Sequence, residues 1–382
     1  MSVKFDLILD LRSGSVGACA YAYEKRAKVP TCLFATRIQI PLQREFDSER
    51  GLGNLAAGIK LALDVTRKHV PGHPRSLSVI IGTPWYLSQT RTVIYKGEGP
   101  MNVDGKLVGR LLDTEIDSFT KEHYPNRPVE IIERVVMKTT LNGYRTNSPY
   151  GKRARELEII FYLSMMDKVL LEMVRKEVAF VYHRSEISLH TFTFAAWQAS
   201  RLSLIRDIPN LTFVDIGGEV SEWTLIEENS ITESVSFPLG AHTITRDIAK
   251  GFNIDLEEAR SLYAAYLEKR TSAAVDKKIV GILSGVGIKW ATYVSGILQK
   301  LSNTRILPSQ YCVVGMPETT RLFCETLDSP LIKSLDLTRN TNSCFLPKVE
   351  ELKQFFVETV YGKPDVFLAL EMLFVDKYVS ML

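Results

Sequence analysis

The chain of 382 residues is poor in cysteine, and its five cysteines follow no metal-binding pattern. Cys19, Cys32, Cys312, Cys324 and Cys344 are odd in number and include no C-x-x-C pair. This spacing indicates neither a zinc site nor a disulfide framework. We therefore expect reduced thiols, as in proteins of the cytosol.

Long apolar runs and leader patterns are also missing. The first letters, MSVKFDLILD, lack the basic, apolar and small-residue order of a signal peptide. No window of 18 residues is apolar and free of charge, and the best candidate, 366–379, contains Glu371 and Asp376. We interpret that stretch as a core helix and expect no direct membrane insertion.

An excess of charge is absent too, because the formal net charge is only +3. No long basic run overrides this balance, and the cluster GKRARE at 151–156 is typical of a solvated turn. The sequence therefore gives no reason to expect a nucleic-acid partner. Apolar residues make up 45% of the chain, which is ample for a sizeable core.

Two similar segments stand out against this ordinary background. FDLILDLRSGSVGACAY (5–21) and LTFVDIGGEVSEWTLI (211–226) each read as a buried strand, a tight turn and a second strand. Asp10 and Asp215 hold the same place at the end of the first strand. A third strand follows each hairpin and runs into a proline, at Pro41 and Pro238. This repeat predicts two like lobes.

The residue types in these hairpins suit phosphate and magnesium. Glycines in a turn let successive backbone N–H groups converge on one anion, and Mg²⁺ is typically held by one or two carboxylates together with phosphate oxygens and water. Taken alone, one such segment is more often a tight β-hairpin without any ligand. Two copies in matched positions favour descent from a phosphate-binding ancestor.

These motifs resemble the FtsA/PilM branch of the actin-like superfamily over nearly the whole chain. LDLRSGSVGACAY and FVDIGGEVSEWTLI are similar to its two phosphate loops, SFPLGAHTITRDIAKGFNIDLEEARSLY to the following segment, and CVVGMPETTRLFCETL to its adenosine loop. The resemblance implies ATP and Mg²⁺ as cofactors, with metal contacts at Asp10 and Asp215. It carries the nucleotide-binding positions onto Asp10, Arg12, Ser13, Gly14, Asp215, Gly217, Gly218, Gly240 and Gly315.

The resemblance also implies a duplicated, ribonuclease-H-like α/β fold of two lobes with a small inserted α+β subdomain. We expect the first lobe at 1–84, the insert at 85–180, a return to the first lobe at 181–208, the second lobe at 209–345, and closing C-terminal helices at 346–382. Within the insert the pattern predicts the order helix, strand, strand, helix. Outside it, helices are predicted at about 53–69, with apolar residues at helical spacing, and at about 188–204. LNGYRTNSPYGKRARELEIIFYLS is similar to the strand-turn-strand of this branch's own subdomain.

Each loop departs from the family pattern in a way that weakens nucleotide binding. Arg12 stands where the first loop has a glycine, and Glu219 stands at the third glycine of the second loop. A carboxylate beside a phosphate site repels the phosphate. Arg260 and Tyr263 replace the nucleoside-contacting Glu and Lys, and the adenosine loop keeps a single glycine, Gly315. We expect hydrolysis to be weak or absent.

The favoured function is therefore a PilM-like cytoplasmic scaffold or adaptor. Such a protein would lie at the inner membrane through a partner of a type IV pilus or type II secretion machine, whose short cytoplasmic segment binds at the insert. The alternatives are an FtsA-like division actin that binds the division tubulin and self-associates, or an ATP-binding switch with slow hydrolysis. The ending LFVDKYVSML lacks the basic amphipathic helix of FtsA, which favours the PilM-like interpretation.

Three further side chains have both a structural and a functional interpretation. Trp85 and Tyr86 follow a buried strand, and packing is a better explanation than an exposed partner anchor. His242 near the third strand of the second hairpin suits helix-start packing better than catalysis.

Overall fold

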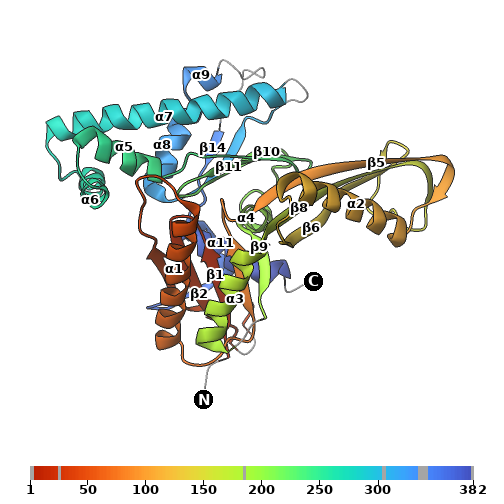
Figure 1. The fold of residues 1–382 in the computed structure, drawn as a ribbon, viewed down its shortest axis with the longest axis horizontal. Helices are drawn as coiled ribbons and strands as arrows, with labels where there is room; N and C mark the ends of the chain where they lie inside the picture. The colour runs from red at the N-terminus through yellow and green to blue at the C-terminus, as the bar shows by residue number, and fades with distance from the viewer. Residues whose placement is uncertain (1–3, 25–26, 184–185, 303–306, 334–342, 380–382) are drawn as a thin grey trace.

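The computed structural model describes residues 4–24, 27–183, 186–302, 307–333 and 343–379 (Figure 1). Three sheets organise these residues. The first sheet has the order β15-β3-β2-β1-β4-β9. Its strands are β1 (Asp6–Leu11), β2 (Ser15–Ala22), β3 (Thr31–Gln39), β4 (Leu77–Ile81), β9 (Ser188–Thr191) and β15 (Val357–Glu358).

The second sheet repeats the plan of the first, with the order β12-β11-β10-β13-β14. Its strands are β10 (Leu211–Ile216), β11 (Ser221–Glu227), β12 (Ser230–Phe237), β13 (Gln310–Val314) and β14 (Ser343–Phe345). Asp10 pairs with Gly17 across one hairpin, and Asp215 pairs with Glu222 at the same step of the other. Both aspartates also lie beside a parallel strand, β4 or β13. The expected duplicated α/β fold of two lobes is confirmed.

Helices cover both faces of the first and second sheets, whose strands β1 and β10 are buried along their whole length. One face of the first sheet packs on α1 (Ser48–His69) and α3 (Lys168–Tyr182). Its other face shares a core with the second sheet through α4 (Phe192–Ser203) and α11 (Val366–Lys377). The shared core brings the two Asp-ended strands into one cleft region.

The outer face of the second sheet is covered by α7 (Ala273–Ser302), α8 (Pro317–Leu327) and α9 (Pro330–Lys333). Two more helices, α5 (His242–Phe252) and α6 (Leu256–Leu267), pack on α7 in a smaller core of their own. The short helices α10 (Val349–Leu352) and η1 (Lys353–Phe355) precede β15.

The insert is a projecting arm built on the third sheet, with the order β5-β8-β6-β7 (Figure 1). Its elements are β5 (Leu87–Asn102), α2 (Gly105–His123), β6 (Val129–Leu141), β7 (Tyr144–Arg145) and β8 (Arg153–Asp167). The apolar face of α2 packs on one face of this sheet. The expected order of the insert was wrong in one element, because it did not include the strand β5. The residues of β5, LSQTRTVIYKGEGPMN, are largely polar, and they form a strand because they pair along β8.

Two helix predictions need adjustment. The helix expected at 188–204 begins only at Phe192, because Ser188–Thr191 pairs in parallel with β4 as β9. The helix expected from 53 begins at Ser48, where Asp47 accepts a hydrogen bond from the Arg50 N–H at 2.8 Å and so caps the helix. The five-segment division of the chain stays a prediction.

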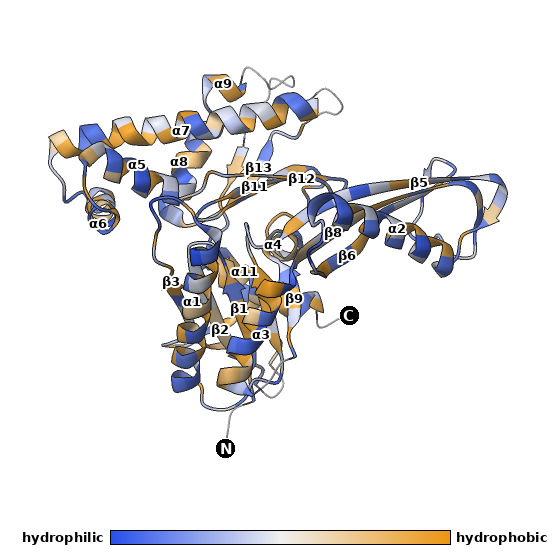
Figure 2. Ribbon diagram, viewed as in Figure 1, coloured by the Kyte–Doolittle hydropathy of each residue, from blue (hydrophilic) through white to orange (hydrophobic). Residues whose placement is uncertain are grey.

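The core-helix interpretation of 366–379 is confirmed, since all residues of α11 from Val366 to Val375 are buried. Among the described residues, α7 is the one helix whose length and composition would allow it to cross a membrane. Only 39% of its most apolar window is buried, and the helix packs on α5 and α8. Figure 2 shows apolar and polar residues alternating along it.

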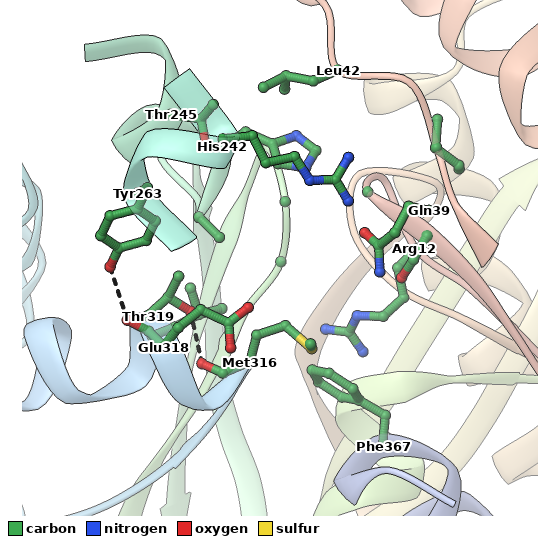
Figure 3. Close-up of a pocket in the computed structure, with 18 residues that line it drawn as sticks. Arg12, Gln39, Leu42, His242, Thr245, Tyr263, Met316, Glu318, Thr319 and Phe367 are labelled. Atoms are coloured by element: carbon green, nitrogen blue, oxygen red, sulfur yellow. Dashed lines mark hydrogen bonds between the residues drawn. The ribbon is translucent and has the colours of Figure 1, made fainter. Parts of the chain in front are cut away.

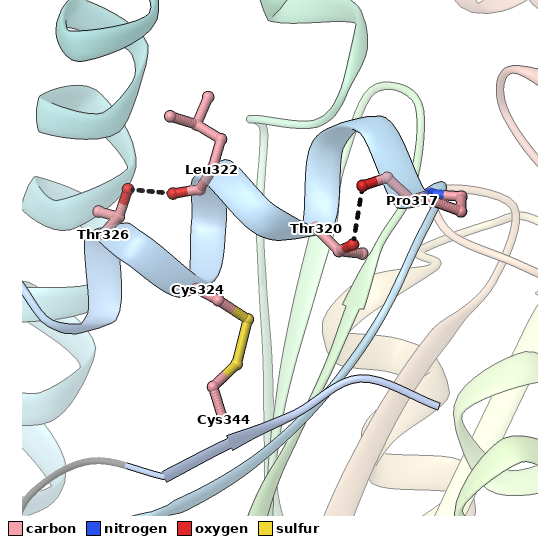
Figure 4. Close-up of a disulfide and its surroundings, with 6 residues drawn as sticks. All are labelled: Pro317, Thr320, Leu322, Cys324, Thr326 and Cys344. Carbon is pink, nitrogen blue, oxygen red and sulfur yellow. Dashed lines mark hydrogen bonds between the residues drawn. A yellow bond between two sulfur atoms is a disulfide. The ribbon is translucent and has the colours of Figure 1, made fainter. Parts of the chain in front are cut away.

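The expectation of five reduced thiols is wrong for one pair. Cys324 of α8 and Cys344 of β14 form a disulfide, which ties the helix to the edge strand of the second sheet (Figure 4). Cys19, Cys32 and Cys312 are free and buried. Spacing in the sequence could not reveal the bond, because the separation of 20 residues matches no framework motif.

Candidate functional site

The turns of the two hairpins meet across the cleft between the lobes. The Glu219 N–H donates a hydrogen bond to Ser13 Oγ at 3.1 Å. A Cβ placed on Gly14 would lie 3.6 Å from Gly218 Cα and 2.7 Å from a ring nitrogen of His242. The glycines are therefore needed here because the two turns and the histidine ring leave no room for a side chain.

All nine residues that the sequence predicted as a nucleotide site lie at this junction. Gly240 packs against the backbone of Gly217 and Gly218, where a Cβ would meet Gly218 O at 2.4 Å. Gly315 follows β13 and lies against Ile216 at the end of β10. The remaining positions are Asp10 and Asp215 at the strand ends, and Arg12, Ser13 and Gly14 in the first turn.

Arg12 is buried in the cleft and connects the lobes. Only 4% of this residue is exposed, and its guanidinium forms an ion pair with Asp215. The rings of Phe192 and Phe367 each lie 4.1 Å from the guanidinium carbon. Two aromatic faces and one carboxylate therefore stabilise a cation that stands where the family has a glycine.

Charges near Arg12 hold the pair ionised. Burial lowers the pKa of Arg12, but the charges of Asp215 and Asp10 outweigh it, and the net pKa is raised. The pKa of Asp215 is raised to about 6, because burial raises it by more than the charge of Arg12 lowers it. That value lies below neutral pH, so the carboxylate is ionised beside the guanidinium at pH 7.

The first aspartate is paired by an arginine that the sequence motifs did not indicate. Arg37 of β3 places Nη2 2.7 Å from Asp10 Oδ2, a contact with the distance of an ion pair but not the angles of a hydrogen bond. The same guanidinium donates through Nη1 to Ser15 Oγ at 2.9 Å and through Nε to Asp365 at 2.5 Å. Burial raises the pKa of Asp365, but Arg37 outweighs burial and lowers it.

Glu219 does not face the cleft as an unpaired charge. Arg246 of α5 donates to both of its carboxylate oxygens at 2.7 Å, and His242 Nδ1 lies 2.9 Å from one of them. Burial raises the pKa of Glu219, but hydrogen bonds and charge from His242 and Arg246 lower it to about 2. Arg246 Nε also donates to Gln43 O of the first lobe at 2.8 Å. This cluster is a second link between the lobes.

A small pocket of about 200 Å³ remains beside these pairs (Figure 3). Arg12 and Phe367 line one side, and His242, Thr245 and Tyr263 line the other. Both residues that replace the family's nucleoside contacts lie here, since Arg260 lines the pocket and Tyr263 donates to Glu318 O at 3.1 Å. His242 is the first residue of α5, as its packing interpretation requires.

A magnesium ion fits this site poorly. Both candidate ligands, Asp10 and Asp215, already lie against guanidinium groups, whose positive charge opposes a divalent cation in the same place. Some of their buried oxygens lack a hydrogen-bond partner among the described residues, so the arginines compensate charge without satisfying every acceptor. No group of three or more His, Cys, Asp or Glu side chains suited to a metal occurs in the described part of the chain.

The root of the insert is joined to both lobes through a buried carboxylate. Glu222 of β11 is 2% exposed and accepts hydrogen bonds from Tyr86, from Ser88 at 3.2 Å and from Thr193 of α4 at 2.9 Å. Trp85 and Tyr86 are 9% and 6% exposed, so they pack inside rather than form an exposed anchor. Further along the arm, Glu228 pairs with Lys138 at 3.1 Å and with Arg145 at 3.0 Å.

Comparison with known proteins agrees with this fold. No model of a known protein family matches the chain. The solved PilM-PilN type IV pilus biogenesis complex contains a chain that is 14% identical, with a TM-score of 0.64 and 98% coverage of both chains. The cell division protein FtsA of Helicobacter pylori strain 26695 is 25% identical over 196 residues, and FtsA of strain J99 is 25% identical over 138 residues.

The sequence matches are partial. They span 51% and 36% of this chain, and only 38% and 27% of the two FtsA proteins. The structural match, in contrast, extends over almost every residue. The chain has the actin-like fold of PilM, and part of its sequence is similar to part of FtsA.

Proposed function

We propose that the chain is a PilM-like scaffold of the cytoplasm that docks a short segment of an inner-membrane protein in a type IV pilus or type II secretion machine. The observation that carries this proposal is the pairing of both hairpin aspartates with the chain's own arginines, Arg12 and Arg37. The cleft is held together by internal charges, so it has little need of a nucleotide and its metal.

Weak or absent ATP hydrolysis follows from the same contacts. Arg12 stands between the carboxylate of the second hairpin and the cleft, and the ring of His242 fills the space between Gly14 and Gly218. A phosphate in that space would have to displace the histidine and compete with Glu219. Each displacement breaks a charged hydrogen bond, which contributes about 1.5–3 kcal/mol.

The junction of the insert with the second lobe is the proposed partner site. A groove of about 690 Å³ lies there, lined by apolar and charged side chains that include Ile160, Leu307, Lys138 and Glu227. An extended peptide of a few residues with an apolar anchor and a charged group suits such a lining. The support from known proteins is the similarity to PilM, whose solved structure is a complex with PilN.

Calorimetric titration with ATP and Mg²⁺ tests the cleft. We expect no binding heat up to about 1 mM ATP. This concentration would reveal any binding free energy more favourable than about −4 kcal/mol. The double variant Arg12→Gly, Glu219→Gly restores the family's glycines and serves as the comparison. Micromolar binding by the wild-type chain would instead support the ATP-binding switch and contradict the scaffold argument.

Peptide binding tests the partner site. The probes are N-terminal cytoplasmic peptides of membrane proteins encoded beside this gene. We expect one of them to bind, and Lys138→Glu to weaken that binding at least tenfold. Lys176→Glu, an exposed lysine of α3, is the matched control. If all such peptides fail to bind, or if both variants lose affinity equally, the proposed site is wrong.

An FtsA-like division actin is the second candidate, because the sequence similarity to FtsA covers half of the chain. That function predicts self-assembly with ATP and binding to the division tubulin. Electron microscopy and co-sedimentation with that tubulin separate the two candidates. Filaments that need ATP would favour the FtsA-like function, and a monomer that binds the membrane-protein peptide would favour the scaffold.

A further inference from the structure

The distal part of the insert arm contains two connected segments, 96–106 and 144–156, which we name the arm tip. They comprise the end of β5, the start of α2, β7 and the start of β8. The Val103 N–H donates to Lys152 O at 2.9 Å, and the Gly151 N–H donates to Val103 O at 2.9 Å. Arg153 Nη2 donates to Pro100 O at 3.3 Å. These bonds hold the two segments together near the end of the arm, where Figure 2 shows mainly hydrophilic residues.

Positive charge is concentrated in the arm tip. Its two segments contain six Lys or Arg and three Asp or Glu, a net charge of +3, which equals the net charge of the whole chain. Two of the three acids are engaged locally: Asp104 caps α2, and Glu156 pairs with Lys96 at 3.2 Å. Glu98 is the third. Four exposed cations have no ion pair with a described residue, namely Lys106, Lys152, Arg153 and Arg155.

Two tyrosines flank these cations. Tyr144 is 80% exposed and Tyr150 is 60% exposed, the first in β7 and the second in the turn before Lys152. A ring with a polar hydroxyl end suits the boundary between water and lipid headgroups, where tyrosine is enriched. Neither tyrosine belongs to the core of the arm, which is formed by α2 and the third sheet.

We propose that the arm tip is a contact surface for a layer of anionic phospholipid headgroups. The partner must be negatively charged, because the unpaired cations are positive. Their side chains lie at the end of an arm, and a planar headgroup layer can meet such an end without a groove. An acidic protein segment is the less favoured partner, because the exposed tyrosines beside the cations suit a layer of lipid headgroups.

The expected attraction is weak. Each cation near an anionic surface increases binding by about fivefold, so a few cations orient a protein without anchoring it. The contact would set the angle of the arm to the membrane while another interaction holds the protein there. It does not depend on the proposed partner groove or on the state of the cleft.

Sedimentation with lipid vesicles tests the proposal on the full chain. The probes are vesicles of phosphatidylcholine alone and of phosphatidylcholine with an equal amount of phosphatidylglycerol. We expect binding to the anionic vesicles at about 50 mM salt and its loss at about 0.5 M salt, where screening is nearly complete. The variant K152Q/R153Q/R155Q is expected to bind about a hundredfold more weakly.

The matched control removes three exposed cations elsewhere, in the variant K68Q/K176Q/K277Q. It should bind as the wild type does, and circular dichroism should show that both variants are folded. Equal losses in the two variants would mean a nonspecific effect of net charge and would overturn the proposal. No binding of the wild type to anionic vesicles, or binding to a polyglutamate peptide alone, would overturn it as well; the latter would indicate an acidic protein partner.

Discussion

Arg12 and Asp215, 203 positions apart in the chain, form a buried ion pair that joins the turn of the first hairpin to the end of the first strand of the second hairpin. The guanidinium lies between the rings of Phe192 and Phe367. The residue that departs most clearly from the family's phosphate loop therefore connects the two lobes directly.

Replacing Arg12 by Met should destabilise the protein by about 3–5 kcal/mol, because Asp215 would be left buried without its cation. The double variant Arg12→Met, Asp215→Asn should recover much of this loss, since neither charge remains. Urea unfolding of the two single variants and the double variant measures the coupling. Arg321→Met, in the exposed pair with Glu325, is the control and should change stability by about 0.5 kcal/mol or less. A coupling near zero would show that Arg12 and Asp215 do not stabilise the closed lobes.

Glu219→Gln should lower the free energy of unfolding by about 1.5–3 kcal/mol at pH 7, because a charged acceptor for Arg246 and His242 is lost. The pKa of Glu219 is lowered from 4.5 to about 2, so its stabilising contribution is complete above the unfolded value and is lost as the pH falls from about 4.5 through 2. Urea midpoints from pH 7 downward should therefore show the wild type and the variant converging. A difference that stays constant at acid pH would exclude the ion pair as its cause. The exposed Glu325→Gln is the control.

Glu133, at the root of the insert, should give the opposite pH dependence. Burial raises its pKa from 4.5 to about 7, and hydrogen bonds from Ser164 and Thr191 lower it only in part. The folded state then binds more protons than the unfolded state between about pH 4.5 and 7, so stability falls as the pH rises through that window.

Glu133→Gln should remove this loss and make the protein relatively more stable at pH 8 than the wild type. Glu130→Gln, three residues earlier on β6, is the control. Thermal or urea unfolding from pH 5 to pH 8 measures both. If the wild type gains stability toward pH 8 relative to Glu133→Gln, the carboxyl is not destabilised by burial and the prediction is wrong.

Thiol labelling should distinguish two classes of cysteine. Without reductant, the native protein should label little, because Cys19, Cys32 and Cys312 are at most 1% exposed. Denaturation without reductant should label these three, and denaturation with reductant should label all five, including Cys324 and Cys344. Mass spectrometry counts the labels. Five labels in the denatured, unreduced protein would show that the disulfide is absent.

The architecture was largely accessible from local patterns. Buried strands that end on Asp10 and Asp215, with Gly/Ser turns after them, predicted two like lobes, and register and sheet order confirm that prediction. The pattern within the insert placed α2, whose buried residues recur at helical spacing, and the apolar stretch at 366–379 placed α11, because both are properties of the segment itself. The polar strand β5 escaped detection because its pairing with β8, rather than its own letters, makes it a strand.

The sequence by itself determined which residues would stand at the cleft, and its resemblance to the FtsA/PilM loops indicated Arg12 and Glu219 as departures from a phosphate site. Only the tertiary structure decided what those side chains do. Arg12 pairs with Asp215 and Arg246 with Glu219, and in each case the partners come together through packing of separate elements. No local pattern encodes such a contact, because charge pairing depends on distances that exist only after the lobes have closed on their shared core.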